Sequence, residues 1–451
     1  MNQDMSGFDN FLYAKMSETK LPSLSVGLVK EREIVHSAAF GFKNIESGVA
    51  TTNRTNYGIG SITKSVTALG IAKLVEQGKL DFHDTVVKYL PSLAKYKAFE
   101  SVEIHHLLAH SSGISALGSA EVLISNAVGL SKKWFPTAAL DDLVSFFDQV
   151  DEWIVTDPGK RFFYLNEGYL LLGEIISKVS GTPYPRFIKE HVLTPLEMKR
   201  SFFTKEELET DGDWATPYQM KEGKADKSVI PWGCSAAGGL MTNTLDLSNY
   251  VQMFLNRGEF NGKKVIGKDV LQKMETPYSK PPISLFPDYG YGYGLFVANN
   301  FLGHKLLRHD GSVGVYTASM AYLPESKLGI SILCNGEGYN LTLLSLYGLI
   351  TMLGQDPNEF EPIKRESLLL KLEGNYVSYK GTVTAHVKRN GDFLMLSGED
   401  IGENIVLVPE KTDDKEATFY TLKSTAKLVV VFTLQKNGIE MIFERYRYRK
   451  S

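Results

Sequence analysis

Cysteine is scarce in this sequence, since Cys234 and Cys334 are the only two among 451 residues. Two thiols are too few for a disulfide framework or a thiolate zinc site, and their separation forms no C-x-x-C motif. We interpret both as small buried apolar side chains, with a single disulfide as the alternative.

An excess of one charge is also missing. The 49 basic and 52 acidic side chains leave a formal charge of −3. The chain therefore lacks the basic surface field of a dedicated nucleic-acid binder. We expect no nucleic-acid partner and a ligand that is small or roughly neutral.

Long hydrophobic runs are absent as well. The most apolar stretch, residues 341–354, is interrupted by Thr342, Ser345 and Thr351 and is shorter than the roughly 20 residues of a membrane span. The chain start has no basic region followed by an apolar one, so no secretory signal is predicted. We expect no membrane partner and a cytoplasmic location.

The sequence does contain enough apolar material for a sizeable core, because 43% of its residues are hydrophobic. The expected elements are a β-hairpin at 24–30 and 34–42, helices at 61–80, 101–108, 140–150, 167–180 and 246–255, strands at 312–322 and 328–334, and a helix at 341–353. Strands at both ends of a helical middle predict one sheet assembled from both ends of a domain, residues 1–355, with an all-helical insertion.

The composition changes after residue 355. Polar residues and proline interrupt both periodicities near Asp356-Pro357-Asn358-Glu359, which predicts a linker at 356–367. Two Asn-Gly pairs, at 390–391 and 437–438, lie between β-rich runs and predict hairpins. A small antiparallel sheet or barrel is therefore expected at 368–451.

One short motif carries chemistry. Ser61-Ile62-Thr63-Lys64 follows the turn-forming Gly58-Ile59-Gly60 and opens a predicted apolar helix. An i, i+3 spacing places the lysine ammonium one turn from the serine hydroxyl, and free N–H groups at a helix N-terminus favour a developing oxyanion. A lysine in a desolvated cleft can have its pKa lowered enough to act as a base. The pattern predicts an activated serine.

The S-x-x-K spacing alone is weak, because it also starts at Ser17, Ser92 and Ser424. Only Ser61 has a glycine-rich entry and a following apolar helix, and its alternative role is a helix N-cap beside a solvent-facing lysine. Two further patterns each occur once. Tyr164-Leu165-Asn166 is the only Y-x-N, and His309-Asp310-Gly311 is the only H-x-G.

The ordered set S-x-x-K, Y-x-N and H-x-G resembles the serine β-lactamase and penicillin-binding-protein superfamily. It is most similar to the branch of class C β-lactamases, D,D-carboxypeptidases and D-aminopeptidases. Residues 107–113, 163–173 and 237–240 resemble the same branch, so the resemblance covers about residues 5–355. It implies an α+β fold in which helices flank an antiparallel sheet beside an all-α subdomain.

The resemblance implies a role for each matching residue. Ser61 would be the acylated nucleophile and Lys64 its activator. Tyr164 would take the serine proton as a phenolate or pass a proton to the leaving group. Asn166 would hydrogen-bond Lys64 or the substrate amide.

The third motif would complete the site. The backbone N–H groups of Ser61 and Ser312 would form the oxyanion hole, and Gly311 would allow close approach of an edge strand. Many β-lactamases carry lysine at the position of the catalytic-site residue His309, whereas a histidine with an unperturbed pKa near 6.5 is largely neutral at pH 7. We therefore expect weakened carboxylate recognition, with β-lactam hydrolysis not the main activity.

Other chemistries lack their motifs. The sequence has no G-x-S-x-G elbow, phosphate-binding loop or dinucleotide fingerprint, so no cofactor is predicted. His106 and His110 have the i, i+4 spacing of a metal pair, but no third ligand is evident. A structural role is favoured for both, and no metal site is predicted.

The predicted function is a serine peptidase that acts through an acyl-enzyme on short peptides, with a D-residue preference implied by resemblance alone. A carboxylesterase of the same fold and a weak β-lactam-binding sensor with little turnover are alternatives. Residues 372–376 resemble the start of a lipocalin-like barrel. The two-part layout resembles archaeal self-compartmentalising peptidases that form cubic octamers, which implies a homo-oligomer. A barrel that holds a small apolar ligand is the alternative for this domain.

Overall fold

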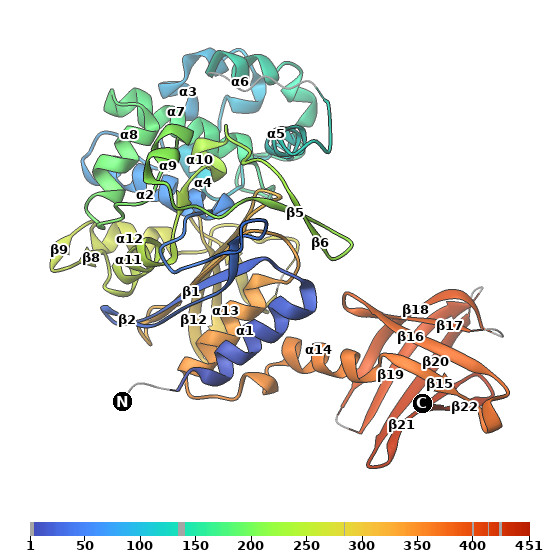
Figure 1. Ribbon diagram of the computed structural model, residues 1–451. Helices are drawn as coiled ribbons and strands as arrows, with labels where there is room; N and C mark the ends of the chain where they lie inside the picture. The colour runs from blue at the N-terminus through green and yellow to red at the C-terminus, as the bar shows by residue number, and fades with distance from the viewer. Residues whose placement is uncertain (1–3, 134–139, 284, 399–400, 414, 424–425) are drawn as a thin grey trace. The chain divides into compact units, whose positions relative to one another are not determined.

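The chain consists of two separately packed units, Met1–Gln355 and Asp356–Ser451. Each unit is described by itself (Figure 1). This computed structural model describes residues 4–133, 140–283, 285–398, 401–413, 415–423 and 426–451. Within these ranges no helix is long and apolar enough to cross a membrane. Cys234 and Cys334 are buried free thiols, so the alternative of a disulfide is wrong.

An eight-stranded sheet forms the centre of the first unit, in the order β10-β11-β12-β13-β14-β1-β2-β3. Its strands are β1 Ser23–Lys30, β2 Glu33–Asn44, β3 Val49–Ala50, β10 Tyr289–Tyr291, β11 Phe296–Phe301, β12 His304–Ser312, β13 Thr317–Leu323 and β14 Leu328–Cys334. The N-terminal and C-terminal strands meet where β1 pairs antiparallel with β14, with Val26 opposite Ile332. The predicted sheet built from both ends of the domain is confirmed.

Helices cover both faces of this sheet (Figure 1). A side chain at Gly329 would point at Val251 of α11, while Ile330 contacts Gly348 of α13. Successive strand residues face opposite sides, so α11 and α13 lie on opposite faces of the sheet. These two helices and α1, which packs beside α13, are α1 Ser6–Thr19, α11 Thr244–Leu255 and α13 Leu341–Met352.

The helical subdomain is inserted between β3 and β10. Its helices are α2 Thr63–Glu76, α3 Val86–Tyr89, α4 Ile104–Leu108, α5 Ser119–Ala127, α6 Leu140–Phe146, α7 Asn166–Ser180, α8 Tyr184–Ile188, α9 Lys205–Asp211, α10 Ser235–Gly238 and α12 Lys268–Met274. Three short two-stranded sheets accompany them, β4 Tyr57–Gly58 with β7 Met241–Thr242, β5 Tyr218–Lys221 with β6 Lys224–Lys227, and β8 Glu259–Phe260 with β9 Lys263–Lys264. A helix is present at each of the six predicted positions, although the one expected at 61–80 ends at Glu76 and the one expected at 140–150 ends at Phe146.

The largest error of the sequence-based prediction concerns β12. A strand was expected from 312 to 322, but β13 begins at Thr317, and Ser312 ends the separate strand β12. The charged and polar residues of β12 interrupt the apolar alternation that marks a strand. The expectation of an edge strand is correct only in part. In the described sheet, β11 pairs with β12 as far as Arg308, and residues 309–312 pair with β13 alone.

The second unit is a closed eight-stranded antiparallel barrel, as expected. Its strands are β15 Gly374–Val377, β16 Thr384–Asn390, β17 Phe393–Gly398, β18 Gly402–Thr412, β19 Glu416–Lys423, β20 Ala426–Gln435, β21 Gly438–Phe443 and β22 Tyr446–Lys450. Both predicted Asn-Gly hairpins are present, between β16 and β17 and between β20 and β21. The stretch interpreted as a linker is largely ordered, because helix α14 (Glu361–Leu372) begins within it.

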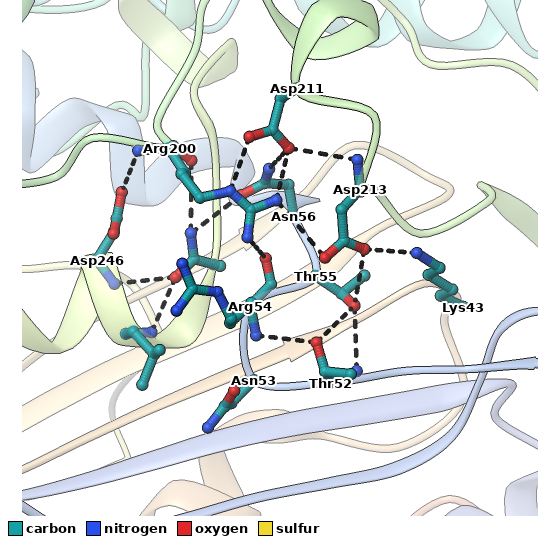
Figure 2. Close-up of polar contacts among 12 residues, drawn as sticks. Lys43, Thr52, Asn53, Arg54, Thr55, Asn56, Arg200, Asp211, Asp213 and Asp246 are labelled. Carbon is teal, nitrogen blue, oxygen red and sulfur yellow. Dashed lines mark hydrogen bonds and ion pairs between the residues drawn. The ribbon is translucent and has the colours of Figure 1, made fainter.

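A polar network holds the segment that leads into β4 (Figure 2). Arg200 donates from Nε and Nη2 to the two carboxylate oxygens of Asp211, at 2.7 and 2.6 Å, and from Nη1 to the carbonyl of Arg54 at 2.7 Å. Asn56 Nδ2 also donates to Asp211, at 3.0 Å. The guanidinium lowers the pKa of the Asp211 carboxyl. Residues 54–56 are thereby tied to the helical subdomain just before the chain reaches Ser61.

Replacing Arg200 by methionine should destabilise the first unit by about 1–3 kcal/mol, because it leaves the mostly buried Asp211 carboxylate without its bidentate donor. Urea unfolding followed by tryptophan fluorescence measures this loss, since all four tryptophans lie within residues 1–355. Arg186→Met is the matched control. Its partner Glu190 is exposed, as is Arg186 itself, so this change should cost less than about 0.5 kcal/mol. Equal losses for the two variants would contradict the role of the network.

Candidate active site

Ser61 lies in a tight turn between β4 and α2. The turn is the 3₁₀ segment η1 (Gly60–Ile62), which runs directly into α2. The N–H of Ile59 donates to the carbonyl of Leu240 at 3.0 Å, which fixes the start of the turn. Gly60 has a φ of +49°, a conformation that favours glycine. Ser61 is thus held at the N-terminal end of α2, as the motif predicts.

Lys64 is completely buried beneath Ser61. Its Nζ lies 3.1 Å from Ser61 Oγ, 2.7 Å from Asn166 Oδ1 and 2.7 Å from the carbonyl oxygen of Ala237. The amine also lies 4.8 Å from the centre of the Tyr164 ring. Burial lowers the pKa of Lys64 to about 7, and the Glu121 carboxylate partly opposes this change.

These three contacts suit both protonation states of the amine. Asn166 Oδ1 and the Ala237 carbonyl can only accept, so they take two N–H groups of Lys64 in either state. When the amine is neutral, its lone pair is left for the third contact, the Ser61 hydroxyl. The arrangement can therefore remove the hydroxyl proton at neutral pH without breaking the other two hydrogen bonds.

Tyr164 stands beside this pair, immediately before α7. Desolvation raises the pKa of its phenol well above the ordinary value near 10, and a hydrogen bond with Ser61 offsets only part of the rise. The resting group is therefore a neutral phenol. Of the two roles implied by the resemblance, proton donation to a leaving group fits this state, whereas a resting phenolate does not.

The end of β12 lies directly against the Ser61 turn. A Cβ at Gly311 would come within 1.9 Å of the Ile59 carbonyl oxygen and 2.8 Å of the Ser61 nitrogen. A Cβ at Gly60 would come within 2.7 Å of the Ser312 nitrogen. Only glycine permits this approach, which places the backbone of Ser312 beside the Ser61 turn, as the predicted oxyanion hole requires. The Ser312 hydroxyl is already engaged, since it donates to Glu337.

His309 has both ring nitrogens occupied. Nδ1 lies 2.6 Å from the Asp310 carbonyl oxygen and must donate to it. Nε2 must then accept from the Tyr291 hydroxyl, at 3.0 Å. Burial, followed by the nearby Lys64 charge, lowers the pKa of His309 to about 3. The ring is neutral near pH 7, as the sequence analysis expects, and its tautomer is fixed.

These residues border a cavity of about 490 Å³. Lys64 and Gly311 do not line it, whereas the other five predicted site residues do: Ser61, Tyr164, Asn166, His309 and Ser312. No lysine or arginine lines the cavity among the residues that the structure describes. A separate cavity of about 540 Å³ near Trp214 and Trp232 contains none of the predicted site residues.

The structure adds participants that the three motifs do not contain. Glu121 of α5 lines the cavity and accepts from Asn166 Nδ2 at 3.2 Å. Ala237 acts through its backbone carbonyl, which leaves no side-chain signal beyond the family-like stretch 237–240. Tyr291, which holds His309, belongs to the aromatic-glycine run at 289–295.

His106 and His110 have separate structural roles. His106 Nδ1 accepts the N–H of Glu103 and caps α4, while His110 Nδ1 accepts the N–H of Leu165, both at 3.0 Å. No cluster of metal-ligating side chains occurs within the described ranges. The preference for a structural role is consistent with these contacts.

A serine hydroxyl beside a buried lysine amine, next to an antiparallel sheet and a helical subdomain, is the arrangement expected of a serine hydrolase. A family model described as Beta-lactamase matches residues 8–350, and a second, described as the Pab87 octamerisation domain, matches residues 357–449. The chain therefore belongs to the β-lactamase family, whose members are serine hydrolases.

Solved structures and curated proteins agree with this placement. The chain is 42% identical to the octameric penicillin-binding protein homologue from Pyrococcus abyssi, with a TM-score of 0.93 over 99% of this chain and 100% of that one. A D-stereospecific amidohydrolase from Streptomyces sp. shares the fold, at 20% identity and a TM-score of 0.63, over 76% of this chain and 98% of that one. Protein flp of Staphylococcus aureus strain MW2 is 26% identical over 74% of this chain and 64% of its own length.

Replacing Gly311 by alanine should lower kcat about 100-fold, because the new methyl group would force β12 away from the Ser61 turn and separate the two N–H groups. Steady-state hydrolysis of a chromogenic amide measures the loss. Gly7→Ala, where a Cβ meets nothing within 4 Å, is the control and should retain full activity. Retained activity in the Gly311 variant would contradict this backbone arrangement.

The pH dependence should report the Lys64 amine. Only the neutral amine can accept a proton, so kcat/KM is expected to rise with pH, with a midpoint near pH 7, and to level off above it. Glu121→Gln should move the midpoint to lower pH, because the carboxylate raises the pKa of Lys64. A kcat/KM that falls as pH rises through 7 would contradict a lysine base.

Proposed function

We propose that the chain is a serine peptidase that acts through an acyl-enzyme on short peptides, with Ser61 as nucleophile and Lys64 as its base. The observation that carries the proposal is the buried Lys64 amine, whose third contact is the Ser61 hydroxyl at 3.1 Å. Burial of a lysine costs free energy, because the ammonium loses its hydration. Here the same burial lowers the pKa of the amine to about 7, which allows it to act as a base near neutral pH.

The reaction would proceed in two halves. Ser61 Oγ bonds to the substrate carbonyl carbon while its proton passes to Lys64 Nζ, and the N–H groups of Ser61 and Ser312 bind the oxyanion. As the C–N bond of the substrate breaks, the leaving amine takes a proton from the Tyr164 phenol. The Lys64 ammonium then gives its proton to Tyr164. Water then attacks the carbonyl carbon of the acyl ester. Its proton passes through Tyr164 and Lys64 to Ser61 Oγ, and the acid and free Ser61 are released.

The charge of the cavity bears on the substrate. A β-lactam or a peptide held by its terminal carboxylate needs a cation, but His309 is neutral and no described lining residue is lysine or arginine. Peptides that do not depend on a carboxylate anchor therefore fit better than penicillins. The D-stereospecific amidohydrolase that shares the fold makes peptides with a D-residue at the scissile bond the substrates to test first.

The assembly we propose is a homo-octamer formed with the help of the second unit. The support is the match of residues 357–449 to the octamerisation domain and the 42% identity to an octameric homologue over the whole chain. Sites within such an assembly would favour small substrates over folded proteins.

Ser61→Ala should lower kcat by at least about 1,000-fold on peptides and esters alike, because it removes the atom that is acylated. Tyr164→Phe should lower kcat on amides more than on activated esters, whose leaving groups need no proton. Ser92→Ala, which alters another S-x-x-K serine on the surface, is the matched control. Full activity of the Ser61 variant would refute the proposal.

The same assay compares D-peptides, matched L-peptides, short-chain p-nitrophenyl esters and a penicillin by kcat/KM. We expect the highest value for a D-peptide amide and the lowest for the penicillin. A strong preference for esters with little amide cleavage would instead identify a carboxylesterase, and a stable acyl-Ser61 without turnover would identify a sensor.

A further inference from the structure

His110, which takes no part in the proposed proton transfers, holds the segment around Tyr164. Tyr164 lies outside regular secondary structure, in the stretch before α7. The N–H of Phe163 donates to the backbone carbonyl of His110 at 2.7 Å. The N–H of Leu165 donates to His110 Nδ1 at 3.0 Å. The N–H groups of the two residues that flank Tyr164 are therefore both bound by the same histidine.

The imidazole also packs on the phenol itself. The ring centres of His110 and Tyr164 are 4.1 Å apart with an interplanar angle of 33°. Tyr169 and Tyr291 enclose the imidazole on other sides, at 5.1 and 4.9 Å between ring centres. The side chain is 1% exposed, so the position of the phenol is set by a rigid and buried surface.

The hydrogen bonds determine the state of the imidazole. Nδ1 accepts from Leu165 and must be unprotonated, so Nε2 carries the hydrogen. Buried Nε2 has no hydrogen-bond partner among the residues that the structure describes. Burial, followed by the charge of nearby Lys64, lowers the pKa of His110 well below its ordinary value, which keeps the acceptor available.

The backbone conformation restricts which residues can replace His110. Its φ is +54°, a region where asparagine, aspartate and histidine are enriched among non-glycine residues. Asparagine combines tolerance of this φ with a side-chain acceptor close to the position of Nδ1. Leucine has nearly the same shape as asparagine and occurs in this chain at a similar φ, +52° at Leu302, but it offers no acceptor.

We propose that His110 is a positioning residue for the Tyr164 proton donor, holding the phenol toward Ser61 and Lys64 through its Nδ1 acceptor and its carbonyl. This inference rests on the proposed function of Tyr164. A loop displaced by about 1 Å at a reacting group can cost about 100-fold in rate. His110 therefore controls kcat while leaving substrate binding nearly unchanged.

Two nearly isosteric variants test the proposal in the full-length protein. His110→Leu should lower kcat on an amide substrate about 30-fold to 100-fold with KM within about 3-fold of the wild type, because the Leu165 N–H loses its acceptor. His110→Asn should keep kcat within about 5-fold. Equal loss in the two variants, or no loss in the leucine variant, would overturn the proposal.

Controls separate positioning from general destabilisation. His106→Leu removes another histidine acceptor of this region, the cap of α4, and should lower the melting temperature without the fall in kcat. If the His110→Leu protein does not fold, His110→Phe, which keeps a ring against Tyr164, takes its place in the comparison with asparagine.

A double variant shows through which group His110 acts. If it acts through Tyr164, His110→Leu combined with Tyr164→Phe should be no slower than Tyr164→Phe alone. Multiplied losses would overturn the inference and leave the proposed function intact. If Tyr164→Phe retains full amide activity, the proposed role of Tyr164 fails first, whatever the His110 variants do.

Discussion

Desolvation of a single amine is the constraint on which the active-site region depends. Lys64 is fully buried, and a buried ammonium is tolerated only when its N–H groups are accepted. The acceptors come from three separate parts of the chain, the Ser61 turn, the start of α7 at Asn166 and the end of α10 at Ala237. The helical subdomain must therefore be complete before the lysine has its working environment.

The sequence predicted the parts of the site that depend on local geometry. Ser61 and Lys64 are one helical turn apart in any α-helix, so their spacing alone indicates proximity. The sheet built from both ends of the first unit was also predictable, because leucine, isoleucine and valine recur through β1 and β14. Strand β12 was missed because its residues Arg308, His309 and Asp310, which lie at the candidate site, are polar and interrupt the apolar alternation of a strand.

Contacts between distant segments could not be predicted in this way. The carbonyl of Ala237 has no residue-type signature, and the clash that excludes a side chain at Gly311 involves Ile59, some 250 residues earlier in the chain. The state of His309 likewise depends on the Tyr291 hydroxyl and on burial. Such features follow from the three-dimensional packing, which a single sequence does not encode in any local pattern.

The second unit has a consequence of its own. Because β15 pairs with β22, the eight strands form a closed ring and leave no strand edge open for another chain to extend. Copies that join through this unit must then recognise one another by outward side chains instead of main-chain hydrogen bonds. The outer surface of the ring carries exposed apolar side chains that could form such contacts. They include Leu422, Val429 and Ile442 on neighbouring strands. A closed ring thus allows self-association while removing the route by which sheets grow without limit.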